Sequence, residues 1–311
     1  MRRLLLWLLV IVGLAGLWAW LQNPERLTLD GGARARAPMQ FATLSDGVTA
    51  FRLEGPPSAP LVVLVHGFSY PSSLWIDTAL ALQAAGFRTL RYDLYGRGWS
   101  DRPGGPYDLP RFRRQLDELL ALLAPGLPVQ LVGLSMGGLI AADYAQAHPQ
   151  RIDRLILMAP FNTAVDVGPL ALPGIGDLLA HLAYFPRQPG LQRANFTDAR
   201  LHTRYLPGFE AQLAYRGYRR AILSTLREII VRDPTPVYRQ LAAEPPPTLL
   251  LWGRDDRVVP LAEAPALLQQ IGPAASLQVI DAAGHLPQLE KPAATHEAMR
   301  RFLAPTLPGG N

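Results

Sequence analysis

Short apolar runs alternate with helical patterns along most of the chain, and this alternation limits the fold more than any other feature. Eight runs predict strands, at 41–44, 50–53, 61–65, 89–92, 129–132, 155–158, 248–252 and 277–280. Several are apolar at consecutive positions, which is typical of strands buried on both faces of a parallel sheet. Helical patterns lie between them, at 74–85, 109–123, 136–147, 262–271 and 293–303. The pattern predicts an α/β fold with a mostly parallel central sheet flanked by helices.

Composition removes several classes of protein. The chain has 311 residues, enough for one large α/β domain or two ordinary ones, and contains no cysteine. A thiolate nucleophile, an iron–sulfur cluster and a thiolate zinc site are therefore excluded. Of the 30 basic residues only Lys291 is not arginine, and because they are scattered we expect no nucleic-acid binding. Two short basic clusters, at 111–114 and 216–220, are interpreted as solvated helix faces, with a surface for anionic lipid as the alternative.

The amino terminus predicts a membrane anchor. After Arg2 and Arg3, residues 4–21 carry no charge and no proline, and such a helix measures about 27 Å against a hydrocarbon core of ~30 Å. Trp18 and Trp20 suit a membrane interface, and the two arginines favour a cytoplasmic amino terminus. The rest of the chain would then be extracytoplasmic, in a periplasm or at the cell surface. Secretion after cleavage of a signal segment, 1–21, is the alternative.

The remaining chain is divided by its composition. Residues 22–38 combine proline, glycine and charges without apolar periodicity, and they predict a tether. The domain core is expected to cover 39–161 and 239–311. Residues 162–238 break the rhythm of strands and helices and are interpreted as an inserted helical cap. Its apolar residues form either the cap's own core or the lining of an acyl channel: Leu170, Leu172, Ile175, Leu178, Leu179, Leu182, Tyr184 and Phe185.

A serine follows the apolar run at 129–132. Gly133-Leu134-Ser135-Met136-Gly137 has the form Gly-x-Ser-x-Gly and leads directly into a helical pattern. Small residues two positions either side of the serine allow a tight, strained turn that lifts its hydroxyl above the sheet. A glycine-rich helix start that serves packing alone is the other interpretation. The preceding strand favours Ser135 as a nucleophile.

A serine nucleophile needs a base, and the base needs an acid that orients it. His285 follows the predicted strand at 277–280 and stands in a loop from which its imidazole can reach the end of the sheet. Asp255 and Asp256 follow the strand at 248–252 in the same way, and spacing alone does not choose between them. A turn-forming or cap-forming role is the alternative for both aspartates.

These residues together resemble the α/β-hydrolase family with a cap, in particular esterases, monoacylglycerol-type lipases and carbon–carbon bond hydrolases. The resemblance covers 41–302, and the chain order Ser, Asp, His agrees with it. The family pattern Gly-x-x-Asp-x-(Val/Ile)-x-Pro implies Asp256 as the acid. The motif His66-Gly67-Phe68 implies an oxyanion hole formed by the backbone N–H groups of Phe68 and Met136, with His66 structural. The loop from Asp93 to Asp101 resembles the family's Asp-x-x-Gly-x-Gly-x-Ser segment and is interpreted as architecture.

The resemblance implies hydrolysis of carboxylic esters, of short to medium acyl chain or monoacylglycerols, through an acyl-enzyme on Ser135. The expected partner is a small, lipophilic ester. A carbon–carbon bond hydrolase is the main alternative, although Leu286 stands where many of that group have tryptophan after the histidine. A catalytically silent binding protein is a further one. No cofactor and no metal are expected, because the chain lacks a phosphate-binding glycine loop and clustered metal ligands. The oligomeric state stays open.

Overall fold

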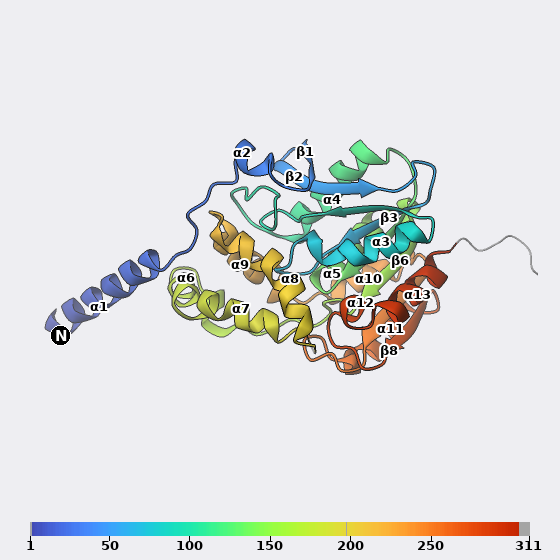
Figure 1. Ribbon diagram of the computed structural model, residues 1–311. Helices are drawn as coiled ribbons and strands as arrows, with labels where there is room; N and C mark the ends of the chain where they lie inside the picture. The colour runs from blue at the N-terminus through green and yellow to red at the C-terminus, as the bar shows by residue number, and fades with distance from the viewer. Residues whose placement is uncertain (1, 197, 305–311) are drawn as a thin grey trace, which may run out of the picture.

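One eight-stranded sheet forms the centre of the protein (Figure 1). The computed structural model describes residues 2–196 and 198–304. The spatial order of the strands is β1-β2-β4-β3-β5-β6-β7-β8, antiparallel from β1 to β4 and parallel for the rest. Every predicted strand lies within one of β1 (Gln40–Leu44), β2 (Gly47–Glu54), β3 (Leu61–Val65), β4 (Arg88–Tyr92), β5 (Val129–Leu134), β6 (Ile152–Met158), β7 (Thr248–Gly253) and β8 (Ala275–Ile280). The predicted α/β-hydrolase architecture, a mostly parallel sheet flanked by helices, is confirmed.

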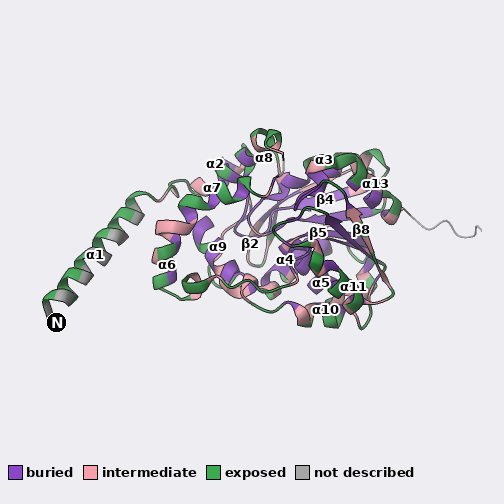
Figure 2. Cartoon of the chain, turned by 90° about the horizontal axis from the view of Figure 1, so that it is seen from below, coloured by how far each residue is buried: buried purple, intermediate pink, exposed green. Residues whose placement is uncertain are grey.

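Both faces of the sheet are buried, and each face has its own core. Consecutive residues of β3 alternate between them, with Val63 and Val65 in one core and Val62 and Leu64 in the other. The first core is closed by α4 (Leu109–Leu123), α5 (Met136–Ala147), α10 (Thr235–Leu241) and α11 (Ala264–Ile271). The second is closed by α3 (Ile76–Ala84), α13 (Pro292–Leu303) and the cap. Figure 2 shows the strands as the buried centre.

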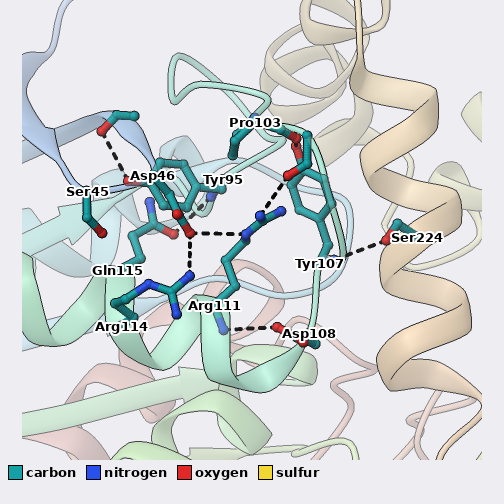
Figure 3. Close-up of polar contacts among 12 residues, drawn as sticks. Ser45, Asp46, Tyr95, Pro103, Tyr107, Asp108, Arg111, Arg114, Gln115 and Ser224 are labelled. Carbon is teal, nitrogen blue, oxygen red and sulfur yellow. Dashed lines mark hydrogen bonds and ion pairs between the residues drawn. The ribbon is translucent and has the colours of Figure 1, made fainter.

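The basic cluster at 111–114 is paired with carboxylates. Arg111 and Arg114 both donate to Asp46, in the turn between β1 and β2, at 3.2 and 2.6 Å (Figure 3). Arg113 lies 3.1 Å from a carboxylate oxygen of Asp143 in α5. These arginines therefore attach α4 to its neighbours. Arg111 is buried, so the prediction of a solvated helix face is wrong for this residue.

Residues 162–238 are mainly helical and cover one end of the sheet (Figure 1). They include α6 (Ile175–Leu179), α7 (Phe185–Arg193), α8 (Arg200–Ala211) and α9 (Tyr218–Thr225), with π-helical turns at 180–184 and 226–230. The cap adds aromatic side chains to the second core, among them Phe185, Phe209 and Tyr218. The last helix of the interval, α10, packs instead against α5 and α11 of the first core. The cap borders at 162 and 238 stay predictions.

The segment 22–38, predicted as a tether, is fastened to the cap. The carbonyl of Ala214 accepts from the N–H of Leu27 at 2.9 Å, and the Leu27 carbonyl accepts from Arg216 at the same distance. The Glu25 carboxylate accepts from the N–H groups of Gly217 and Arg219, at 3.1 and 2.6 Å, where α9 begins. Residues 31–34 form a single helical turn, α2 (Gly31–Arg34). Composition gave no sign of these contacts because they join groups about 190 residues apart.

The amino-terminal helix α1 (Arg2–Leu21) projects away from the rest of the molecule (Figure 1). Among the residues that the structure describes, no helix is both long and apolar enough to cross a membrane. The anchor predicted at residues 4–21 includes several positions, Leu4 and Leu8 among them, whose side chains lie outside the described residues. The span is thus unsupported by the structure and stays a prediction.

Candidate active site

Ser135 occupies a strained turn between β5 and α5. Its backbone angles, φ 54° and ψ −123°, are ones that an L-residue rarely adopts, at a cost of about 1–3 kcal/mol. Two glycines make the turn possible through close approach. A Cβ on Gly133 would lie 2.2 Å from the Gly137 carbonyl oxygen, and one on Gly137 would lie 2.4 Å from the carbonyl oxygens of Val65 and His66. The two glycines of the motif therefore allow the start of α5 to pack against the ends of β3 and β5.

The loop after β3 lies beside the serine. Strand pairing sets Val65 opposite Gly133, so that Gly67 comes against Ser135, with 3.4 Å between the serine Cβ and a Cβ built on Gly67. Phe68 follows in this loop, and Met136 is the first residue of α5. The N–H of a first helical residue has no partner within its own helix and can serve a ligand. Phe68 and Met136 thus lie in the two segments next to Ser135, and their N–H groups as an oxyanion hole stay a prediction.

His66 orients the peptide that carries the N–H of Phe68. Its Nε2 accepts from the backbone N–H of Leu94 at 2.9 Å, so its proton resides on Nδ1, 2.9 Å from the carbonyl oxygen of Gly67. In a trans peptide the carbonyl and the N–H point in opposite directions. Holding the Gly67 carbonyl therefore fixes the direction of the Phe68 N–H. Complete burial lowers the pKa of the His66 imidazole to about 3, which keeps the ring neutral.

His285 and Asp256 form a buried pair at the ends of β8 and β7. His285 Nδ1 lies 2.9 Å from Asp256 Oδ2, and each residue is 6% exposed. The other oxygen of Asp256 accepts from the N–H groups of Val258 and Val259, at 2.8 and 3.0 Å. With Nδ1 engaged by a carboxylate, Nε2 is the nitrogen left to act as a base. The neighbouring Asp255 is exposed, so the structure favours Asp256, the aspartate that the family pattern implied.

Gly253 lets the loops of the acid and the base touch. A Cβ at this position would lie 2.0 Å from the Gly284 carbonyl oxygen and 2.5 Å from that of Ala283. The N–H of Asp255 donates to the Ala283 carbonyl at 2.8 Å and ties the two loops together. The glycine that ends β7 is therefore a requirement of the His285–Asp256 contact.

Ser135 and His285 line one cavity of about 440 Å³ between the core and the cap. Its other walls are largely apolar and come from Phe68, Tyr70, Leu74, Leu134, Leu191, Ala194, Val258 and Leu286, with Gln192, Asn195 and Arg257 as polar members. In the described part of the chain, none of the eight cap residues named above as core or acyl lining contributes to it. Leu172 and Ile175 are 53% and 63% exposed instead. The cap reaches the cavity through the end of α7, which helical period alone did not indicate.

The remaining candidates have structural surroundings. Asp93 is buried and accepts from the N–H groups of Ser72 and Trp99, at 2.7 and 2.8 Å, which supports its architectural interpretation. His148 lies against the Tyr144 ring, and His296 contacts Thr78. Across 2–196 and 198–304, no group of three or more His, Asp or Glu side chains could hold a metal ion.

Comparison with known proteins identifies the family. A family model described as the alpha/beta hydrolase fold matches residues 60–292, about three quarters of the chain. The protein therefore belongs to the α/β-hydrolase family.

Its relatives carry two kinds of chemistry. The chain is 31% identical over 305 residues to a 2-hydroxy-6-oxononadienedioate/2-hydroxy-6-oxononatrienedioate hydrolase of Cupriavidus pinatubonensis, covering 90% of this chain and 98% of the relative. It is 31% identical over 255 residues to a pimeloyl-[acyl-carrier protein] methyl ester esterase of Aeromonas salmonicida, covering 78% and 95%. A solved membrane phospholipase A shares the fold, with a TM-score of 0.69, 23% identity and coverage of 97% and 98%.

The geometry predicts which aspartate matters. Asp256→Asn should lower kcat/KM by about 10⁴-fold, because the imidazole loses the acceptor that fixes its tautomer. Ser135→Ala and His285→Ala should be at least as severe. Asp255→Asn, at an exposed site, should stay within about threefold of the parent and serves as the matched control. Initial rates on a chromogenic ester, with circular dichroism to confirm folding, provide the measurement; a crippled Asp255 variant beside an active Asp256 variant would reverse the assignment.

Burial of His66 predicts a pH dependence of stability. The folded ring takes up a proton only near pH 3, whereas an unfolded imidazole does so near 6.5, so the unfolded chain holds more protons between these values. His66 should therefore cost the fold about 1.4 kcal/mol per pH unit as pH falls below 6.5. Urea unfolding of the parent and His66→Gln from pH 7.5 to 5 should give curves that diverge by this slope. Parallel curves would contradict the buried neutral ring.

Proposed function

We propose that this α/β-hydrolase is a serine esterase that forms an acyl-enzyme on Ser135. The observation that carries the proposal is the buried His285–Asp256 pair opening into the same cavity as the serine of the strained turn. His285 Nε2 takes the Ser135 proton as Oγ attacks the ester carbonyl carbon. The same proton then passes to the leaving alkoxide. Water, deprotonated by His285, releases the acid and restores the serine.

The backbone N–H groups of Phe68 and Met136 donate hydrogen bonds to the oxyanion of each tetrahedral intermediate. Their peptides are fixed before substrate arrives, one by His66 and one by the start of α5. Preorganised donors of this kind stabilise the charge without rearrangement in the transition state, and one such donor is worth about 10² to 10³ in rate.

Carbon–carbon bond hydrolysis is the second candidate, because the Cupriavidus relative has that substrate class by name. The Aeromonas relative, at the same identity, is an esterase by name, so identity does not choose. The cavity favours the ester. Leu286 directly follows the histidine and lines the cavity, and Arg257 is the single cation among the described lining residues, which suits an apolar acyl group better than a dicarboxylate.

The largely apolar lining predicts a dependence on acyl length. Each methylene that the cavity buries contributes up to ~0.8 kcal/mol, so kcat/KM on p-nitrophenyl esters should rise from acetate to a short or medium chain and then fall. A vinylogous diketone should be turned over more slowly than the best ester. Ser135→Ala is the control for both substrates. A decline from acetate upward would remove the lipophilic substrate, and faster turnover of the diketone would favour the carbon–carbon hydrolase.

We propose also that α1 holds the enzyme at a lipid bilayer, with the catalytic domain on the extracytoplasmic side. The described side chains of α1 support an apolar environment, since those of Leu5, Leu6, Trp7, Val10, Leu14, Leu17, Trp18 and Leu21 are all 46–67% exposed on a helix that projects from the domain. Apolar exposure on this scale is unfavourable in water and marks a surface that binds lipid or protein. A bilayer would place ester lipids near the cavity.

Removal of residues 1–21 tests this placement. Hydrolysis of a soluble ester should be unchanged, because α1 contributes no residue to the catalytic cavity within the described chain. Hydrolysis of a vesicle-borne ester should slow by at least tenfold, since the enzyme loses its effective concentration at the surface. Full-length Ser135→Ala should still float with vesicles. An equal loss on both substrates would show instead that α1 supports the active site.

A further inference from the structure

Arg97 is a buried cation that donates hydrogen bonds both to the loop after β3 and to the cap. The residue is 0% exposed, and no carboxylate lies within ion-pair distance of its guanidinium among the described residues. Nε donates to the carbonyl of Phe68 at 2.8 Å, and Nη2 donates to the hydroxyl of Thr225, in α9 of the cap, at 2.9 Å. The guanidinium also lies over the rings of Phe68 and Phe112, at 5.7 and 5.6 Å.

A buried arginine without a counter-ion is costly unless every donor finds an acceptor. Burial lowers the pKa of Arg97 to about 10, which still leaves it charged at neutral pH. The charged guanidinium is therefore stabilised by hydrogen bonds to neutral oxygens, those of Phe68, Tyr95 and Thr225. One of these belongs to the cap. If the cap moves away, Arg97 loses this acceptor and is drawn toward water, together with the loop that it holds.

Gln212 makes a second, independent link between the cap and the same loop. It lies in the short helix η5 (Gln212–Ala214) after α8 and is 2% exposed. Its Nε2 donates to the carbonyl of Ser69 at 2.6 Å, and its Oε1 accepts from the N–H of Gly98 at 2.9 Å. Phe68 and Ser69 are consecutive residues of the loop after β3, which we call the oxyanion loop. Two cap side chains thus hold their carbonyls, Gln212 directly and Thr225 through Arg97.

We propose that the cap sets the oxyanion hole, with Arg97, Thr225 and Gln212 as positioning residues that bring the N–H of Phe68 to its catalytic position only when the cap is seated. The inference rests on the proposed esterase function. It gives the cap a task beyond enclosing the substrate. On the carboxyl side of Phe68, Gln212 of the cap holds the Ser69 carbonyl, and Thr225 of the cap supports Arg97, which holds the Phe68 carbonyl. The peptide on the amino side of Phe68 is fixed by His66. Movement of the cap away from the core would then also displace the N–H of Phe68 from its catalytic position.

Paired variants test the link through Thr225. Thr225→Val keeps the shape but removes the acceptor for Arg97, whereas Thr225→Ser keeps it. Ser224→Ala is the matched control, because Ser224 directly precedes Thr225 in α9 and accepts from the N–H of Tyr107, outside the oxyanion loop (Figure 3). Gln212→Met repeats the test from another element. Each variant is compared by kcat and KM on a soluble ester, with thermal unfolding to monitor folding.

The decisive measurement compares the affinities of each variant for two ketone inhibitors. A trifluoromethyl ketone is attacked by Ser135 Oγ, its carbonyl oxygen becomes an oxyanion, and the serine proton moves to His285; the corresponding methyl ketone stays planar. Thr225→Val and Gln212→Met should each lower kcat and trifluoromethyl ketone affinity by about tenfold, since a small misplacement of a catalytic donor has effects of this order. Methyl ketone affinity and KM should stay within about threefold. Thr225→Ser and Ser224→Ala should match the parent.

Three results would overturn the proposal. They are an unchanged trifluoromethyl ketone affinity in both Thr225→Val and Gln212→Met, an equal loss for both ketones, or an equal loss in Thr225→Ser and Thr225→Val. If Thr225→Val does not fold, Gln212→Met alone decides. The proposed function is judged separately, by the activity of the parent against Ser135→Ala.

Discussion

The backbone of Ser135 lies in a conformation that costs free energy, and the surrounding structure is arranged to hold it there. The serine is fixed on one side by the end of β5 and on the other by α5. Gly133 lets the end of β5 approach α5, and Gly137 lets α5 approach the end of β3, because neither residue has a side chain. The same close approach sets the loop after β3 beside the serine hydroxyl. The positions of the candidate nucleophile and of both candidate oxyanion donors thus follow from one local constraint, which the buried parallel strands are rigid enough to bear.

The candidate acid Asp256 and the candidate base His285 depend on a second close approach, at Gly253, where the loops after β7 and β8 share a backbone hydrogen bond. All of these residues lie at the carboxyl ends of parallel strands, where an open α/β sheet presents its loops to one cavity. The cap closes that cavity. Buried hydrogen bonds join the cap to the loop after β3, from Gln212 directly and from Thr225 through Arg97, so the cap is mechanically linked to the candidate oxyanion donor Phe68.

Sequence reasoning predicted the elements whose signals are local. The strands, α4, α5 and the serine turn follow from runs of neighbouring residues, and each was located to within a few positions. Spacing alone did not choose between Asp255 and Asp256; the family pattern did, and the contact with His285 agrees with it. The cavity wall from α7 and the fastening of 22–38 were missed. So were the hydrogen bonds between Thr225 and Arg97 and between Gln212 and Ser69, which join residues 128 and 143 positions apart and carry no local pattern.

In the proposed mechanism Ser135 is the nucleophile, and the backbone N–H groups of Phe68 and Met136 hold the oxyanion of the tetrahedral intermediate. The most direct measurement is the crystal structure of the enzyme inactivated by a fluorophosphonate, with peptide mapping of the adduct. One phosphonyl group is expected on Ser135, with its oxygen about 2.7–3.1 Å from both backbone N–H groups. A label on another serine, or a phosphonyl oxygen on Ser135 that contacts neither N–H group, would contradict it.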